Sequence, residues 1–499
     1  MVDIGEEDWE RFGRARKAAA PEIVELNEWR SCPESFDAAS YHCQTLIHRA
    51  HVVMLAEADI ITREEAAAII DGVKSVAVEA EADPRLTGYM STETALINKV
   101  GEVGGKMHTA RSRNDLGHTQ RRLYYREQVE RAIGSVIEFR RRLLDAAESN
   151  VETYMPGYTH LMQAQPVTLA HYLLAHVEAA GRTVQRLEDV YRRTNLSPMG
   201  AAAFAGTSWK IDRHRTMELL GFDGLVENSQ DAVASVDYFM EISAALAIHM
   251  TNLSRLAQDV QLWSTDEYAM IDLDEAYAGT SSIMPQKKNP LVLEQVKSYA
   301  SECIGAMAAV FSAVKGVSYS HMQDKVLLEP VVLDTVVGCT NVMAGVAETM
   351  RPVKEKMMDR LREGFSTMTD LADTLVRLHG VSFRQAHDIV VEVTLGAFRD
   401  SVKAGDITAD IVMEASEKVV GRALKVPERE LHMAVDPVLN VQRRSVIGGP
   451  APESVREMIE NQRSRLRDEE ERRRNRIERV AQTNEKLVRA EQALGAPRS

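Results

Sequence analysis

Residues 239–260, FMEISAALAIHMTNLSRLAQDV, show the clearest periodic pattern in the chain. The apolar residues recur every three or four positions, which places one apolar stripe along about six turns of a helix. The stripe consists of Phe239, Ile242, Leu246, Met250, Leu253, Leu256 and Val260. Similar patterns recur near residues 119–150, 168–194, 292–315 and 331–349. The sequence therefore predicts five long helices that pack as an elongated bundle.

The overall composition favours the same all-α fold. The 499 residues include 28 glycines and 15 prolines, which are fractions below the typical values of about 7% and 5%. The helix formers Ala, Leu, Glu, Arg and Met are abundant instead. Proline is absent from residues 85–155, 199–284 and 291–329. Because a proline in a helix interior costs about 3 kcal/mol, these stretches can hold long helices. No segment alternates convincingly as a strand would.

The charge and the apolar content exclude several classes of protein. The 60 Lys and Arg against 74 Asp and Glu give a net charge of −14, so nucleic acid is not an expected partner. Disorder is not expected with 44% hydrophobic residues, and no run approaches the roughly 18 apolar residues of a membrane span. The acidic start, MVDIGEEDWERF, lacks the apolar core of a signal peptide. The four cysteines, which form no CxxC pair, favour a reducing cytoplasm over a disulfide framework or a zinc ribbon: Cys32, Cys43, Cys303 and Cys339.

The helical patterns divide the chain into four parts. Residues 1–108 contain shorter helices and turns, and residues 109–360 hold the long helices of a central bundle. Shorter helices return in residues 361–460, and residues 461–499 form a charged helical tail. One heptad position of the tail is apolar, but its companion position is mainly polar, so a coiled coil is weakly supported. A solvated helix lying on its own protein is favoured over an interaction tail or a nucleic-acid contact.

Two polar clusters lie where predicted helices begin. The first, HTARSRND at residues 108–115, combines two guanidinium groups, a hydroxyl and an amide just before a helix. Such groups suit carboxylate recognition, although an N-cap followed by a salt-bridged first turn would look the same. The second, GYTHLMQAQP at residues 157–166, places a titratable imidazole, His160, in a loop beside Thr159. A lone histidine of this kind is often structural.

The third polar cluster is GTSSIMPQKKNP at residues 279–290. Its glycine, prolines and serines indicate a loop, and its two lysines make that loop electropositive, so it could close over an anion and bring a hydroxyl to it. A mobile surface loop without function is the alternative. The three clusters supply anion binders, a histidine and a serine, but no Cys/His metal set, no GxGxxG and no P-loop. They suggest a site for a polyanionic substrate that needs no cofactor and no metal, but their spacing does not show that they meet.

The same three motifs resemble those of a known family. GTSSIMPQKKNP resembles the signature loop of the fumarase/aspartase superfamily, and its MPQKKNP form, together with TARSRND and GYTHLMQAQPVTLAHYLLAH, is similar to the argininosuccinate lyase branch. The resemblance extends through FAGTSWKIDRHRTMELLGF, FRQAHDIVVEVTLGAF and RRSVIGGPAPESVREMI. It implies a three-domain all-α fold and a homotetramer built on the central helices. Each active site would take its three clusters from three different subunits.

The resemblance also implies a reaction and a role for each matching residue. The reaction is anti β-elimination of an N-substituted aspartate, such as argininosuccinate, to fumarate and an amine. Ser281 would be the base, and Lys287 and Asn289 would stabilise the resulting carbanion. His160 would assist proton transfer with Glu294 as its carboxylate partner. Because serine is a poor base at its ordinary pKa, the positive loop must activate it. The implied substrate-binding residues are Ser112, Arg113, Asn114, Thr159, Met284, Gln286 and Asn289.

The chain departs from the family pattern at several positions. Leu291 stands where the family usually has Asp, His321 where it has Tyr, and Val236 where it has Arg. Leu116-Gly117 replaces Gln-Val, and MSTETAL at residues 90–96 replaces a segment like DIHTAIE. A site that hydrogen-bonds a guanidinium rejects partners that leave its polar groups unpaired. The amine released is therefore not necessarily arginine. The alternatives are a lyase for aminopolycarboxylates such as ethylenediamine-disuccinate (EDDS), an inactive structural paralogue like the lens crystallins, and a scaffold that acts through the tail.

Overall fold

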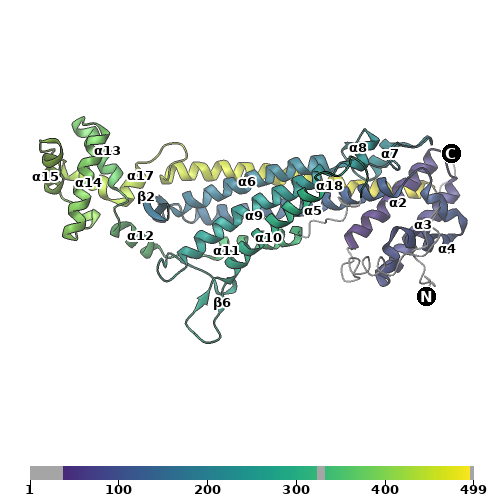
Figure 1. Ribbon diagram of the computed structural model, residues 1–499, viewed down its shortest axis with the longest axis horizontal. Helices are drawn as coiled ribbons and strands as arrows, with labels where there is room; N and C mark the ends of the chain where they lie inside the picture. Colours follow the sequence, from purple (N-terminus) through teal and green to yellow (C-terminus); the bar gives the residue numbers. More distant parts are fainter. Residues whose placement is uncertain (1–37, 323–331, 495–499) are drawn as a thin grey trace.

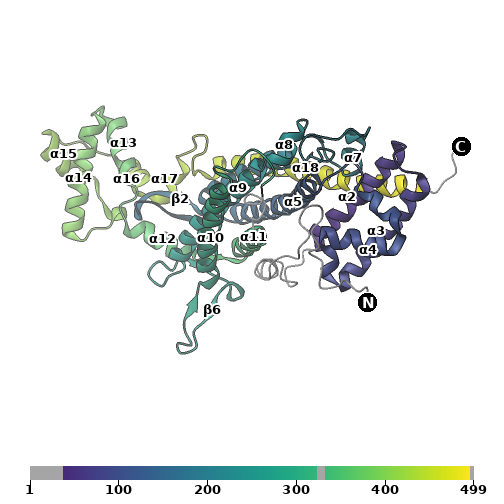
Figure 2. The same ribbon diagram turned by 45° about the vertical axis from the view of Figure 1, so that its right-hand side comes forward.

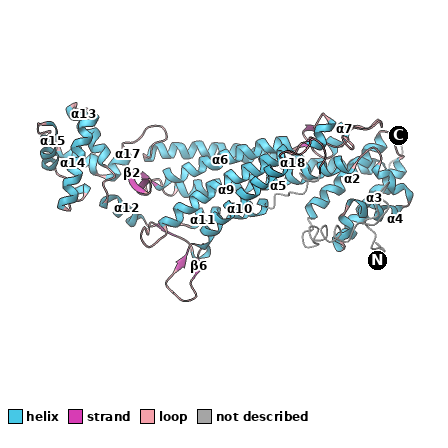
Figure 3. Cartoon of the chain, viewed as in Figure 1, coloured by secondary structure: helices cyan, strands magenta, loops and turns pink. Residues whose placement is uncertain are grey.

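The computed structural model describes residues 38–322 and 332–494, which form an elongated and predominantly helical molecule (Figures 1 and 3). The predicted all-α fold is confirmed. The acidic N-terminal stretch and Cys32 lie outside the described residues. Within the described residues, no helix is long and apolar enough to cross a membrane.

Five long helices make the central bundle, where the sequence predicts them. They are α5 (Arg113–Glu148), α6 (Leu169–Thr194), α9 (Asp237–Trp263), α10 (Leu291–Val314) and α11 (Val332–Thr349). Figure 1 shows them side by side along the long axis of the molecule. The whole apolar stripe of α9, from Phe239 to Val260, is buried in the largest hydrophobic cluster. The periodicity therefore identified the face of α9 that packs into the core.

Smaller helical units lie at the two ends of the bundle. At one end, α2 (Ala38–Glu57), α3 (Arg63–Ala82) and α4 (Tyr89–Val100) surround a second hydrophobic cluster. At the other end, a third cluster lies among α13 (Met368–His379), α14 (Phe383–Asp400), α15 (Ala409–Val420) and α16 (Glu428–Val435). Figure 1 shows these units at opposite ends of the molecule. The shorter helices are α7 (Arg213–Leu219), α8 (Ser229–Ala234), α12 (Lys354–Glu363) and α17 (Pro437–Gln442).

Short strands connect the helices, although the sequence predicts none. The longest pair is the antiparallel hairpin of β1 (Tyr154–Thr159) and β2 (Met162–Thr168). Its alternation is hidden because each strand contains a proline, and the register shifts between Pro156 and Tyr158. The other pairs are two residues long: β3 (Leu196–Ser197) with β4 (Gly224–Leu225), β5 (Ile271–Asp272) with β8 (Arg351–Pro352), and β6 (Gly279–Thr280) with β7 (Lys288–Asn289).

Helix α18 (Pro452–Leu494) runs beside the bundle and reaches the N-terminal helices (Figures 1 and 2). Its early residues join the core of the bundle, whereas Leu487 and Leu494 join the N-terminal cluster. Surface ion pairs connect α18 to α5 and α6. The charged tail is thus a helix that lies on its own protein, as the sequence favoured, and it is continuous through residues 460 and 461.

One buried ion pair joins α18 to the bundle. The Arg140 guanidinium on α5 pairs with the Glu469 carboxylate, and its other nitrogen donates to Gln462 Oε1 at 2.8 Å. Arg140 and Glu469 are 1% and 4% exposed. Removing one partner of a buried pair leaves an uncompensated charge, which is far more costly than losing a surface pair.

We expect Glu469→Ala to lower the free energy of unfolding by about 3–5 kcal/mol, because Arg140 would remain buried without its counter-charge. The control is Glu485→Ala on the same helix, whose exposed pair with Arg489 should contribute less than about 0.5 kcal/mol. Chemical denaturation at one fixed protein concentration measures both. Equal effects of the two substitutions would contradict the importance of the buried pair.

Candidate active site

The three polar clusters lie far apart within one chain. Ser112 to Asp115 begin α5, whereas the hairpin that carries Thr159 and His160 follows the other end of that helix. The 36 residues of α5 span about 54 Å at 1.5 Å per residue. The loop between β6 and β7, which carries Ser281, projects from the side of the bundle (Figures 1 and 2). One chain therefore does not bring the predicted residues together.

The first cluster forms the N-terminus of α5 and presents polar groups to solvent. Ser112 is the N-cap, and its Oγ accepts a hydrogen bond from the Asn114 N–H at 3.2 Å. The Arg113 side chain on the first turn is exposed and belongs to none of the ion pairs among the described residues. The N-cap of the simpler interpretation is present, but the salt-bridged first turn is not. An exposed guanidinium at the positive end of a helix is suited to binding a carboxylate.

Asp115, which the sequence analysis did not single out, holds this helix start in place. It is fully buried, and its carboxylate accepts backbone N–H bonds from Ser112 at 2.9 Å, Gly200 at 3.1 Å and Ala202 at 2.9 Å. Burial raises the pKa of Asp115 to about 6, although these bonds favour its charged form. The Asn114 amide also donates to the Ala203 carbonyl at 3.0 Å. The loop at residues 200–203 thus fixes the orientation of the α5 N-terminus.

The second cluster is the tip of the β1–β2 hairpin. His160 and Leu161 occupy its two-residue turn with φ of 55° and 60°, the left-handed conformation that type I′ turns require. This conformation costs roughly 1–2 kcal/mol for each non-glycine residue. Leu161 and Met162 are 67% and 71% exposed. A strained tip that exposes two large apolar side chains is typical of a segment that contacts another surface.

His160 also borders a cavity of about 240 Å³ behind the tip, together with Tyr158, Asp259 and Trp263. Its predicted carboxylate partner lies elsewhere in the same chain. Glu294, on the first turn of α10, instead accepts a hydrogen bond from the Gln261 amide at 3.2 Å. No hydrogen bond or ion pair joins His160 to Glu294 among the described residues.

The third cluster is a loop whose base is fixed and whose tip is exposed. Gly279 and Thr280 pair with Asn289 and Lys288, and the Lys288 ammonium binds the Asp272 carboxylate and, at 2.7 Å, the Leu273 carbonyl. Lys287, its neighbour, is exposed and makes none of the ion pairs found in residues 38–322 and 332–494. The two adjacent lysines therefore differ: one anchors the loop and the other remains available to a ligand.

Within this loop, Ser281 accepts hydrogen bonds from two backbone N–H groups. The Met284 N–H lies 3.0 Å and the Ile283 N–H 3.4 Å from the Ser281 Oγ. Donors aimed at an oxygen favour its negatively charged form. The turn therefore favours the alkoxide form of Ser281, which its predicted role as a base requires. Met284 and Gln286, the other predicted binding residues of the loop, are exposed.

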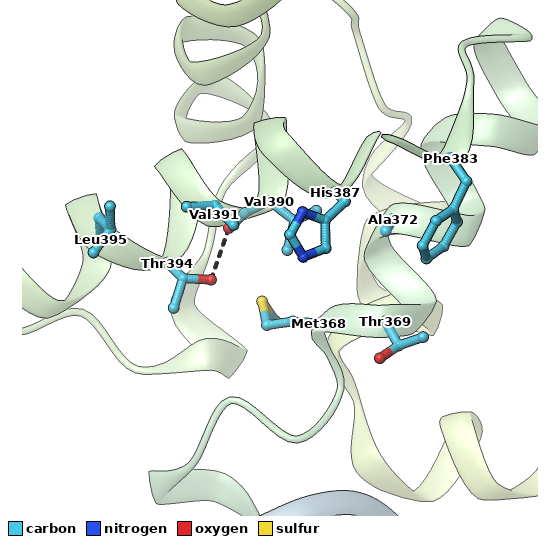
Figure 4. Close-up of a pocket in the computed structure, with 9 residues that line it drawn as sticks. All are labelled: Met368, Thr369, Ala372, Phe383, His387, Val390, Val391, Thr394 and Leu395. Atoms are coloured by element: carbon cyan, nitrogen blue, oxygen red, sulfur yellow. Dashed lines mark hydrogen bonds between the residues drawn. The ribbon is translucent and has the colours of Figure 1, made fainter. Parts of the chain in front are cut away.

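A larger cavity elsewhere carries none of these residues. A pocket of about 310 Å³ lies between α13 and α14, where Met368, Phe383 and Leu395 line it around the single imidazole of His387 (Figure 4). Its walls are mainly apolar and it contains none of the predicted site residues. It is therefore not the candidate active site.

Comparison with known proteins assigns the chain to a family. A family model described as Lyase matches residues 35–305, and a model described as Argininosuccinate lyase C-terminal matches residues 365–442. The argininosuccinate lyase of Methanococcoides burtonii is 40% identical over 463 residues, covering 91% of this chain and 92% of that protein. That of Methanocaldococcus jannaschii is 42% identical and covers 87% and 90%. The chain belongs to the argininosuccinate lyase family.

Solved structures of this superfamily confirm the fold. EDDS lyase in complex with formate is 40% identical, covers 97% of both chains and superposes with a TM-score of 0.90. A class II fumarase from Schistosoma mansoni, with 15% identity and a TM-score of 0.68, shares the fold alone. The predicted fumarase/aspartase-like architecture, and an enzyme of the carbon–nitrogen lyase class, are therefore confirmed.

The positions where this argininosuccinate lyase family member departs from the usual pattern fall into two groups. Leu116 and Val236 are buried within the chain's own core, so they pack rather than face a ligand. Leu291 is 43% exposed at the start of α10, next to the serine loop. His321 lies edge-on against His118 of α5, with ring centroids 5.7 Å apart. These last two positions lie beside the candidate site residues.

Proposed function

We propose that this protein cleaves an N-substituted aspartate by anti β-elimination to fumarate and an amine. The observation that carries this proposal is the Ser281 loop, in which the serine accepts two N–H bonds beside an unpaired Lys287. EDDS lyase, which is 40% identical, has been solved with bound fumarate in a double variant. Conservation of the fold over 97% of the chain supports the same reaction class.

Each of the predicted site residues would have its own role in this reaction. Arg113, Ser112, Asn114 and Thr159 would bind the succinyl carboxylates through charge-assisted hydrogen bonds. The Ser281 Oγ would take the Cβ proton, which leaves an aci-carboxylate dianion. Asn289, Lys287 and the loop residues Met284 and Gln286 would surround this charge as it develops. Departure of the amine then breaks the C–N bond and yields fumarate, while His160, with Glu294 as its partner, would deliver a proton to the leaving nitrogen.

We infer that the active enzyme is a homotetramer with sites shared between three subunits. The α5 helix separates the first two clusters by about 54 Å, so they can meet only between copies of the chain. Helix α10 supports this assembly because it exposes Ile304 and Phe311, which lie seven residues apart on one face, and also Tyr299, each at 41–45%. Apolar faces of this extent usually pack against another protein surface.

The residues at the two positions expected to face the leaving amine, Leu291 and His321, favour a substrate other than argininosuccinate. Leu291 replaces a carboxylate that would attract a cationic arm, and His321 replaces a phenol. The EDDS lyase variant solved with fumarate carries methionine in place of an aspartate and a tyrosine that are thirty residues apart. Leu291 and His321 are also separated by thirty positions (321 − 291). Because Leu291 offers no negative charge to a cationic arm, a neutral or anionic N-substituent, such as that of an aminopolycarboxylate, fits better than a guanidinium. The retained serine, lysine and asparagine of the loop argue against an inactive paralogue.

We expect Ser281→Ala to reduce kcat for fumarate release by about 10³-fold, because the base would be lost. The neighbouring serine gives a matched control, since Ser282→Ala should leave kcat within about threefold of wild type. The ultraviolet absorbance of fumarate, followed with a panel of N-substituted aspartates, measures both variants. Wild-type turnover by Ser281→Ala would refute the role of the serine, and no fumarate from any substrate would favour the structural paralogue.

Mixed tetramers test whether sites are shared. Arg113→Ala and Ser281→Ala should each be inactive alone, but co-refolding them should restore activity at about a quarter of the sites by random assortment. In such sites Arg113 comes from one chain and Ser281 from another. The control mixture, Ser281→Ala with Lys287→Ala, alters the same loop twice and should restore nothing. Failure of the first mixture in a correctly assembled tetramer would rule out the shared site.

Restoring the aspartate that the family usually has at position 291, at the start of α10, should change which leaving amine the enzyme prefers. Leu291→Asp should raise kcat/KM for substrates with a cationic N-substituent at least tenfold relative to neutral ones, since a carboxylate would again face the arm. Leu291→Asn provides the uncharged control. Steady-state kinetics on paired substrates measure the ratio, and an unchanged ratio would show that residue 291 does not contact the amine.

A further inference from the structure

A cluster of buried polar side chains lies directly behind the α5 N-terminus. Gln44, His48 and His51 occupy one face of α2, spaced four and three residues apart, and are 5%, 0% and 1% exposed. Arg111, in the loop before α5, is 6% exposed. Tyr89 of α4 and His108 complete the group through a hydrogen bond between the Tyr89 hydroxyl and the His108 Nδ1. We name these six residues the Arg111 cluster.

The donors of the Arg111 cluster lack acceptors. Apart from a side-chain contact with the Tyr89 hydroxyl, the Arg111 guanidinium has no hydrogen-bond partner of good geometry within the described part of the chain. Both ring nitrogens of His48 and Gln44 Nε2 have none there either. Buried polar groups are normally satisfied, so a group left unpaired needs an explanation. Arginine can only donate hydrogen bonds. The missing partner is therefore an acceptor, most simply an anion.

Arg111 provides the only positive charge of the cluster. Burial and the neighbouring Arg111 lower the pKa values of His48 and His108, and lower that of His51 to about 3, so these rings stay neutral near pH 7. His51 Nε2 lies 2.9 Å from the Thr109 carbonyl, which fixes the loop that carries Arg111.

The acidic neighbours do not neutralise Arg111. The Asp115 carboxylate is occupied by backbone N–H groups of its own helix start and of the loop at residues 200–202. Glu93 of α4 influences Arg111 electrostatically, yet no ion pair between them occurs among the described residues. A single unneutralised guanidinium surrounded by neutral donors matches the charge of one carboxylate.

We propose that the Arg111 cluster is a subsite for a carboxylate on the N-substituent of the substrate. This inference rests on the proposed function, since Arg113 would hold the succinyl end. The Cα atoms of Arg111 and Arg113 lie at most about 7 Å apart. Because the Arg111 side chain is buried and that of Arg113 is exposed, the N-substituent must carry an arm that reaches from one to the other. The partly exposed side chains of Tyr89, Glu93 and His108 would form the rim through which the carboxylate enters. The substrate class is thus an aspartate whose nitrogen bears a carboxyalkyl arm.

Arg111→Met tests the proposal with two substrates of equal length, N-(2-carboxyethyl)aspartate and N-propylaspartate. We expect kcat/KM to fall at least about 30-fold for the carboxylated substrate, because a charge-assisted bidentate pair is lost, and to change less than about threefold for the propyl substrate. Arg113→Met is the matched control, since it should impair both substrates alike. The melting temperature of Arg111→Met should equal or exceed that of wild type, because methionine removes an unpaired buried charge.

Equal losses on both substrates would show that Arg111 only supports the α5 N-terminus, and no loss on either would place the carboxylate elsewhere; both results overturn the subsite. If wild type cleaves neither substrate, the proposed function fails, but the subsite remains testable by binding. Glutarate should then raise the melting temperature of wild type and not of Arg111→Met. A glutarate shift in both proteins, or in neither, would overturn the proposal.

Discussion

The rigidity of α5 is the constraint on which the rest of the architecture depends. A continuous helix of 36 residues holds its first turn and its last turn about 54 Å apart, and a helix buried on this scale cannot fold back on itself. Ser112 and Arg113, which we propose to bind carboxylates, lie at its start, and the hairpin that carries His160 follows its end. Any site that uses both ends must therefore borrow one end from another copy, and the exposed apolar face of α10 provides a surface for that association.

Helix α18 connects the central bundle to the N-terminal helices. It packs on α5 and α6, and its end contributes Leu487 and Leu494 to the N-terminal hydrophobic cluster. The N-terminal helices also receive the Glu491 carboxylate, which pairs with Arg49 and Lys74. The Glu491 side chain is only 4% exposed, so its pairs act together with the buried apolar contacts and the Arg140–Glu469 pair to connect α18 to the rest of the chain. The orientation of α2 against α5 therefore depends partly on the far end of the chain.

Whether a part of this molecule could be predicted from sequence depends on whether its structure imposes a regular pattern on the residues. Helical periodicity identified α9 because burial of one face imposes a regular spacing on the residues. The sequence did not predict the β1–β2 hairpin because Pro156 and Pro166 interrupt the alternation of apolar and polar residues. Its strained turn at His160 and Leu161 also lacks the glycine or asparagine that usually indicates such a turn. The buried position of Arg111 was also not predicted. The HTARSRND motif does not show that its two arginines, two positions apart, lie in opposite environments, one buried and one exposed.

The distribution of charge explains how an acidic protein can bind a polyanion. Four of the ten arginines of α18, namely Arg463, Arg472, Arg473 and Arg476, pair with carboxylates of α5 and α6 in the described structure. Within residues 38–322 and 332–494, Lys287 and Arg113 form no ion pair, for local reasons. Lys288 occupies the only carboxylate that pairs with this loop in the described structure, Asp272, and backbone amides occupy Asp115 beside Arg113. The fold therefore directs nearby acids to other partners, and the charge of −14 does not neutralise the residues that would meet the substrate.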